Sequence, residues 1–198
     1  DYNLKYKCSK DNNGKVLAAS INLDAIAVVS KNDDNIIRVK SKGHKMNVVD
    51  LDDLVPNEAN FGSSTTLVQG VAATIKNLGY TVAGFDACTT SDVMGGSGLS
   101  SSAAFEVLLG SILSYMFNDG KISPVEIAKV AQYSENVFFG KPCGLLDQMA
   151  SSVGTFVTID FKSTKDPVIK KIDFDFSKSG HSLCIVDTHG NHSDLTDD

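Results

Sequence analysis

The segment Gly95–Val107, with the sequence GGSGLSSSAAFEV, decides the fold, because a polar loop passes directly into apolar, helix-favouring residues. Three glycines and four serines occupy seven of its first eight positions. Such a loop can bind an anion, because the first N–H groups of the following helix are free, the helix dipole attracts negative charge and glycines allow close approach. Serines in the first turn can cap the helix, bind phosphate oxygens or ligate Mg²⁺.

Two interpretations of these serines compete. In the first, Ser100–Ser102 cap a core helix and the glycines form a turn, but one serine is enough for a cap. In the second, the loop binds phosphate, and the excess of serines favours this interpretation. The segment is not a Walker loop, because no lysine follows it, and it is not a dinucleotide fingerprint, because Ser101 stands where the third glycine should be.

Around the loop, strand and helix patterns are mixed without regular alternation, which predicts an α+β fold. Strands are expected at two places in 15–31, around a bend near Asn22, and at 35–42, 46–54, 84–92, 155–161, 168–176 and 181–188. Helices are expected at 64–80, 101–117, 123–140 and 145–152.

Two of these helices have clear sequence signals. In the first, apolar residues recur at helical spacing, with Gly79 as the C-cap: Leu67, Val71, Ile75 and Leu78. The third begins with a capping box of Ser123 and Glu126 around Pro124. The helix at 101–117 is apolar on nearly every face, so we expect it in the core.

The composition excludes several classes of protein. The 198 residues carry a net charge of −6, which argues against nucleic acid or an anionic membrane as the main partner. We expect no membrane span and no signal peptide, because no apolar run reaches about 18 residues. The cysteines are scattered without a C-x-x-C pair, which favours reduced thiols in a cytoplasmic protein: Cys8, Cys88, Cys143 and Cys184.

Two motifs carry a resemblance to a known family. GGSGLSSSAA resembles the G-x-G-L-x-S-S-A-A loop with which the GHMP small-molecule kinases wrap the phosphates of ATP, although Met94 stands where these kinases usually have proline. QYSENVFFGKPCGLLDQ, residues 132–148, resembles the galactokinase signature Q-x-x-E-[HN]-x-F-x-G-x-P-C-G-[ILM]-[ML]-D-Q. The order and spacing of the motifs agree with that family, and the similarity spans roughly residues 14–198, including GNHSDLTDD at 190–198.

The resemblance implies a fold and a set of binding residues. Residues 1–179 would form a GHMP-kinase N-terminal domain of the ribosomal protein S5 domain 2-like fold, and 180–198 would begin a second α+β domain. Ser102 and Glu135 would ligate Mg²⁺, which prefers hard oxygen ligands. The ATP phosphates would be bound by Gly95, Gly96, Ser97, Gly98, Leu99, Ser100, Ser101 and Ser102.

Asp147 is the candidate catalytic residue, because an aspartate between leucines and a methionine is poorly placed without a function. By resemblance it faces the sugar hydroxyl that attacks the γ-phosphate, either as general base or as an electrostatic orienter. Gly144 would contact the sugar through its backbone. From the residues alone, Glu135 could also be an exposed helix glutamate and Asp147 the N-cap of the short helix. Cys143 is interpreted as a packing residue.

The chain departs from the family pattern near both ends. An early arginine-containing motif is matched either by Asp1–Asn3 followed by an insertion or by Cys8–Asp11, and both alignments lack its arginine. Arg38 is the single arginine, so phosphate would be bound by N–H groups, a metal or an arginine from elsewhere. A second glycine-rich motif near the C-terminus is also missing. We therefore expect about half of a family member, with an exposed apolar interface that favours self-association.

These features lead to the hypothesis of a Mg²⁺-dependent, galactokinase-like enzyme. It would transfer the γ-phosphate of ATP to the anomeric hydroxyl of galactose, with small molecules as its partners. Three alternatives remain open from the sequence: another sugar substrate within the same family, a non-catalytic sugar- or nucleotide-binding relative, and an inactive fragment.

Overall fold

The fold is that of a computed structural model, which describes residues 14–163 and 166–186. Four strands form a mixed sheet in the order β2-β5-β3-β4. They are β2 (Ala25–Lys31), β3 (Ile36–Ser41), β4 (Met46–Asp50) and β5 (Phe85–Ser91). β2 pairs with β5 and β3 with β4 in antiparallel register, whereas β3 and β5 are parallel. Ile37 and Val39 are buried and Arg38 between them is not, so the sheet has one apolar face.

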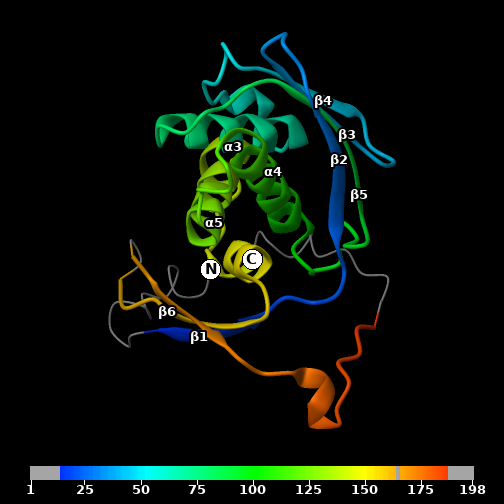
Figure 1. The fold of residues 1–198 in the computed structure, drawn as a ribbon, viewed down its shortest axis with the longest axis vertical. Coiled ribbons are helices and arrows are strands. Elements are labelled where there is room, and N and C mark those ends of the chain that lie inside the picture. The colour runs from blue at the N-terminus through cyan, green and yellow to red at the C-terminus, as the bar shows by residue number, and fades with distance from the viewer. Residues whose placement is uncertain (1–13, 164–165, 187–198) are drawn as a thin grey trace.

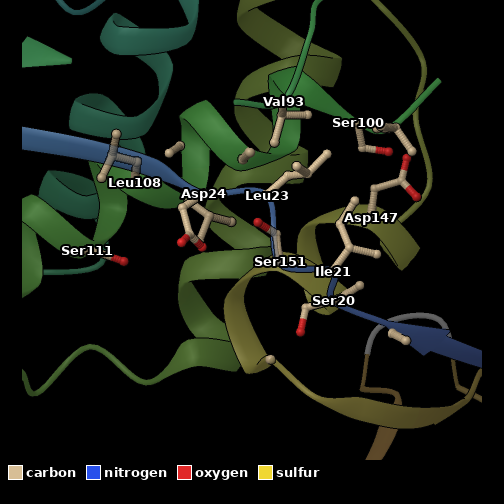
Figure 2. A pocket seen from close by; sticks show the side chains of 17 residues that line it. Ser20, Ile21, Leu23, Asp24, Val93, Ser100, Leu108, Ser111, Asp147 and Ser151 are labelled. Carbon is tan, nitrogen blue, oxygen red and sulfur yellow. The ribbon is translucent and has the colours of Figure 1, made fainter. Parts of the chain in front are cut away.

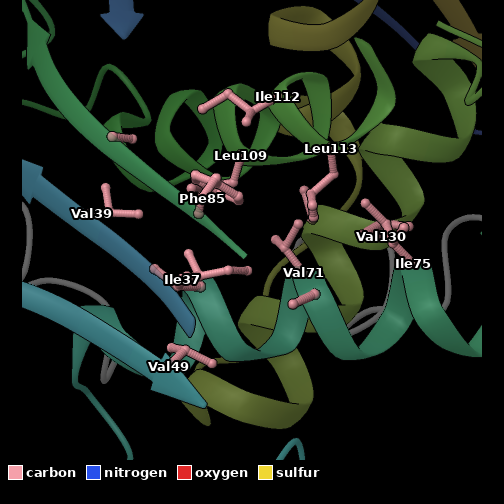
Figure 3. Close-up of a cluster of buried hydrophobic side chains, with 14 of the residues drawn as sticks. Ile37, Val39, Val49, Val71, Ile75, Phe85, Leu109, Ile112, Leu113 and Val130 are labelled. Atoms are coloured by element: carbon pink, nitrogen blue, oxygen red, sulfur yellow. The ribbon is translucent and has the colours of Figure 1, made fainter. Parts of the chain in front are cut away.

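Two helices cover this apolar face, α3 (Ser64–Asn77) and α4 (Ser101–Phe117), and a third, α5 (Pro124–Tyr133), packs on both of them (Figure 1). Figure 3 shows where the layers meet. There, side chains of the sheet point toward those of the helices, and the buried cluster includes Ile37, Val39, Val49, Phe85, Val71, Ile75, Leu109, Leu113 and Val130. The main core therefore lies between the four-stranded sheet and the helices.

A second, three-stranded sheet lies below the helices in Figure 1 and has the order β1-β6-β7. Its antiparallel strands are β1 (Lys15–Ala19), β6 (Phe156–Asp160) and β7 (Val168–Ile172). The short helix α6 (Leu146–Val153) packs on this sheet and on α4 and α5. Met149 of α6 is buried with Val157 and Ile159 of β6 in a second apolar cluster. This packing determines where the first turn of α6, which carries Asp147, lies.

The helix expected at 123–140 is confirmed at its start and divided at its end. Ser123 and Glu126 form the reciprocal capping box, and Pro124 occupies the first helical position. The α-helix ends at Tyr133, however, and continues as the π-helix η2 (Ser134–Phe139), which stops at Gly140 with φ +80°. The Ser134 hydroxyl donates to the Leu67 carbonyl of α3 at 2.9 Å, so tertiary packing accompanies the wider turn.

The other expected elements are confirmed, with several exceptions. The strands expected at 46–54 and 168–176 end early, at Asp50 and Ile172. Residues 181–186 form no regular structure, so the strand expected at 181–188 is wrong over its described part. A strand needs a neighbouring strand to pair its backbone groups, so the apolar composition of this segment was not enough to predict one. Leu78, expected on the apolar face of α3, is 54% exposed and is the C-cap residue in place of the expected Gly79, which follows it with φ +87°. Two short 3₁₀ helices complete the fold, η1 (Glu58–Asn60) and η3 (Phe176–Ser179).

Apolar side chains remain exposed on both sheets and beyond η3. The most exposed are Leu17, Ile26, Val28, Val168, Leu183 and Val186. The exposed apolar interface expected from the sequence and the self-association expected with it stay predictions. Within 14–163 and 166–186, no helix is both long and apolar enough to cross a lipid bilayer.

Gly70 of α3 tests the packing against η2. An added Cβ would lie 2.3 Å from Ser134 Oγ and 2.9 Å from Phe138 Cγ, which is too close for a side chain. We expect Gly70→Ala to lower the free energy of unfolding by about 1–3 kcal/mol, measured by urea titration, because the overpacked helices must separate. Gly95→Ala is the matched control, since nothing lies within 4 Å of that position. Equal midpoints for Gly70→Ala and the parent chain would contradict this packing.

Candidate functional site

The glycine- and serine-rich loop connects the end of β5 to the start of α4. Gly96, Gly98 and Ser100 have positive φ values of 74°, 76° and 61°. This left-handed conformation at every second residue requires glycine at the first two positions and is unusual for the serine at the third. Glycines in this conformation let the backbone of the loop approach a ligand closely.

Ser100 is the N-cap residue of α4, but its side chain makes no capping hydrogen bond. The first backbone bond at this end is donated by the Ala104 N–H to the Ser100 carbonyl at 3.1 Å. The interpretation in which Ser100 caps the helix through its hydroxyl is therefore wrong. Because the side chain does not occupy the helix terminus, the first-turn N–H groups are available to a ligand.

Ser102 and Glu135 come together although 33 positions separate them in sequence. The Ser102 hydroxyl donates to Glu135 Oε1 at 3.1 Å. Glu135 is only 3% exposed, so the interpretation as a solvent-exposed helix glutamate is wrong. The Lys141 ammonium lies 3.9 Å from the same oxygen. A hydroxyl and a carboxylate beside the loop are hard oxygen donors that fit Mg²⁺, which commonly takes its other ligands from phosphate and water.

A buried polar layer lies behind this pair. Gln148 Nε2 donates to Glu135 Oε2 at 2.9 Å, and Gln148 is 1% exposed. Glu106 of α4 is fully buried, and burial together with the Glu135 carboxylate raises its pKa to about 9. Glu106 is therefore a neutral acid at pH 7. Burial also raises the pKa of the Cys143 thiol, which agrees with a packing role and argues against a nucleophile.

A cavity of about 500 Å³ opens between the loop, α6 and the segment that joins β1 to β2. Leu99 and Ser100 line it from the loop side and Asp147 from the first turn of α6. Figure 2 shows the side chains of Ser100 and Asp147 on the same side of this cavity. Asp147 is exposed, and the N-cap of α6 is Leu145. The interpretation of Asp147 as an N-cap is therefore wrong, and its carboxylate is accessible to a molecule in the cavity.

The structure thus brings together three of the groups expected from the sequence: the loop, the Ser102–Glu135 pair and Asp147. Gly144 directly precedes the N-cap of α6 and does not line the cavity. Arg38 lies on β3, where it binds Asp34 and Asp86, and does not line the cavity either. Asp1–Asn3, Cys8–Asp11 and the segment 190–198 lie outside the described residues.

Sequence reasoning missed several residues of this site. Ser20, Ile21 and Asp24 line the cavity from the segment between β1 and β2, where no periodic pattern indicated a function. Glu106 was available as a signal, because it is the one charged residue in the otherwise apolar helix 101–117. Gln148, a polar residue that directly follows Asp147 in an apolar stretch, was a second such signal.

Comparison with known proteins places this geometry in a family. Residues 66–155, which include the loop, Glu135 and Asp147, match the family described as GHMP kinases N terminal domain.

Residues 66–155 of the chain form a GHMP kinase N-terminal domain.

The relatives of this GHMP kinase domain include galactokinases. That of Streptomyces coelicolor is 34% identical over 184 residues, which are 92% of this chain and 47% of the relative. That of Clostridium tetani is 35% identical over 144 residues, 72% of this chain and 36% of the relative. The crystal structure of Lactococcus lactis galactokinase complexed with galactose has a TM-score of 0.71 at 24% identity, covering 83% of this chain and 43% of that chain. The chain therefore spans about half the length, or less, of these relatives.

Glu106 gives this domain a testable pH dependence. Its pKa rises from an ordinary 4.5 to about 9 on folding, so between these values the unfolded chain releases a proton that the folded chain keeps. The free energy of unfolding should therefore fall as pH rises, by up to about 1.4 kcal/mol per pH unit. We expect Glu106→Gln to flatten this decline and to be more stable than the parent chain at pH 8, measured by urea titrations from pH 5 to 9. Glu58→Gln, at an exposed glutamate, is the control; parallel pH curves for the parent chain and Glu106→Gln would exclude a neutral Glu106.

Proposed function

We propose that this GHMP kinase domain belongs to a galactokinase-like enzyme, which transfers the γ-phosphate of ATP to the anomeric hydroxyl of galactose. The observation that carries the proposal is that Ser100, at the free end of α4, and Asp147 line the same cavity. A phosphate held at the helix terminus and a hydroxyl beside Asp147 would thus meet in one space. The galactokinases among the relatives supply the substrate class.

In this proposal the loop binds the phosphates of ATP through backbone N–H groups, for which the left-handed residues and the uncapped start of α4 are suited. Ser102 and Glu135 would hold Mg²⁺, which would neutralise charge on the transferring phosphate. Asp147 accepts a hydrogen bond from the sugar hydroxyl, orients it toward the phosphate and takes its proton as the new O–P bond forms and the bond from the γ-phosphorus to the leaving oxygen of ADP breaks. Phosphoryl transfer depends mainly on such positioning and charge stabilisation.

The domain boundaries are part of the proposal. Residues 1–179 form the N-terminal domain, and 180–198 begin the second. The exposed Leu183 and Val186, which follow η3, support a boundary near residue 180, because apolar side chains there are not buried against the described domain. Cytoplasmic localisation is likewise proposed, from the three free thiols within the described residues, Cys88, Cys143 and Cys184.

Asp147→Asn tests the catalytic role. The amide is nearly isosteric but cannot accept the proton, so galactose-dependent ADP release from MgATP should fall by about 10²–10⁴-fold with the fold unchanged by circular dichroism. Asp119→Asn, in an exposed turn, is the control and should keep full turnover. Unchanged turnover in Asp147→Asn would remove Asp147 from the mechanism. A folded parent chain that binds galactose or ATP without turnover would instead identify a binding-only relative or an inactive fragment.

Glu135→Gln tests the cation site. Loss of the carboxylate charge should raise the Mg²⁺ concentration for half-maximal ADP release by at least about tenfold, because an amide is a much weaker ligand for a hard cation. Glu58→Gln is again the control, at an exposed glutamate of η1. A Mg²⁺ requirement that is the same in both variants would contradict the assignment of Glu135.

A further inference from the structure

Gln148 connects the two halves of the proposed site and has no role in the mechanism above. It follows Asp147 directly in the first turn of α6. Successive residues of a helix point about 100° apart, which agrees with an exposed Asp147 that lines the cavity and a buried Gln148 on the inner side.

The Gln148 amide is oriented toward Glu135. Its Nε2 donates to Glu135 Oε2 at 2.9 Å and approaches Cys143 Sγ at 3.5 Å. Its Oε1 is buried and has no hydrogen-bond partner within the described chain. A buried amide with one unpaired atom is costly, so packing favourable to the amide itself does not explain this side chain. The carboxylate is the group that gains from its position.

The two oxygens of Glu135 have different partners. Oε1 accepts from Ser102 and lies near Lys141, on the side of the loop. Oε2 accepts from Gln148. Gln148 also lies close to the Glu106 carboxyl group, but both oxygens of Glu106 are buried without a hydrogen-bond partner in the described part of the chain, so the hydrogen bond that forms is the one to Glu135. The hydrogen bond from Gln148 therefore fixes the rotation of the Glu135 carboxylate and turns Oε1 toward Ser102.

We propose that Gln148 is a positioning residue, which holds the Glu135 carboxylate toward Ser102 and ties the cation-binding pair to the helix turn that carries Asp147. This inference rests on the proposed function, because Ser102 and Glu135 hold a divalent cation only in that proposal. Groups that orient a metal ligand from behind commonly change metal affinity by 10–100-fold when they are removed.

The test is the affinity for Mn²⁺ in the presence of ADP, measured by electron paramagnetic resonance on the 198-residue chain, without turnover. Gln148→Met keeps the length of the side chain and removes the donor. We expect it to raise the Kd of Mn²⁺ about tenfold. The matched control is Gln132→Met. The Gln132 amide donates to the backbone carbonyl of Cys143 at 3.2 Å and not to Glu135. The control should bind Mn²⁺ within twofold of the parent chain.

A second measurement separates positioning from stability. Urea titrations of the metal-free chains will report any loss of folding free energy, whereas a purely structural role predicts an unchanged Kd in a less stable protein. If Gln148→Met does not fold, Gln148→Asn takes its place, because its shorter amide no longer reaches Glu135. In the background of Glu135→Gln, the further change Gln148→Met should alter the Kd by less than twofold, because Gln148 acts through that carboxylate.

The outcomes distinguish this inference from the proposed function. Tight Mn²⁺ binding by the parent chain that Gln148→Met leaves unchanged overturns the positioning role alone. No Mn²⁺ binding by the folded parent chain with ADP overturns both. A tenfold loss confined to Gln148→Met supports both.

Discussion

The burial of the Glu135 carboxylate is the constraint on which the rest of the site depends. A carboxylate that is 3% exposed is costly unless charged or polar partners surround it. Three elements supply these partners: α4 through Ser102, α6 through Gln148 and the turn after η2 through Lys141. The polar layer that satisfies Glu135 therefore also determines how these elements approach one another beside the glycine- and serine-rich loop.

The apolar packing makes this arrangement possible. Gly70 lets α3 approach the π-helix that carries Glu135 so closely that a methyl group would not fit between them. Met149, which directly follows the polar Gln148, anchors α6 to the three-stranded sheet. The loop and Asp147, which belong to different segments of the chain, consequently line one cavity, although their helices are anchored in two separate hydrophobic clusters.

Much of the fold could be predicted because its signals are local. The capping box of Ser123 and Glu126 lies within four residues and begins α5 where expected. The bounds of α4 were predicted at 101–117 and observed at Ser101–Phe117, since the change from polar loop to apolar helix is abrupt. Where a signal required a distant partner, prediction failed: 181–186 is apolar in places, yet no strand of the described chain pairs with it.

By itself, the sequence determined the α+β class, the helix terminus behind the glycines and, through resemblance, the candidate residues of the site. Tertiary structure alone decided that Ser102 meets Glu135, that Gln148 donates a hydrogen bond to this carboxylate and that Asp24 and Ile21 share a cavity with Asp147. The physical reason is the range of the interactions. Capping and helical periodicity act over a few neighbouring residues, whereas the pairing of a buried carboxylate depends on how separate helices pack.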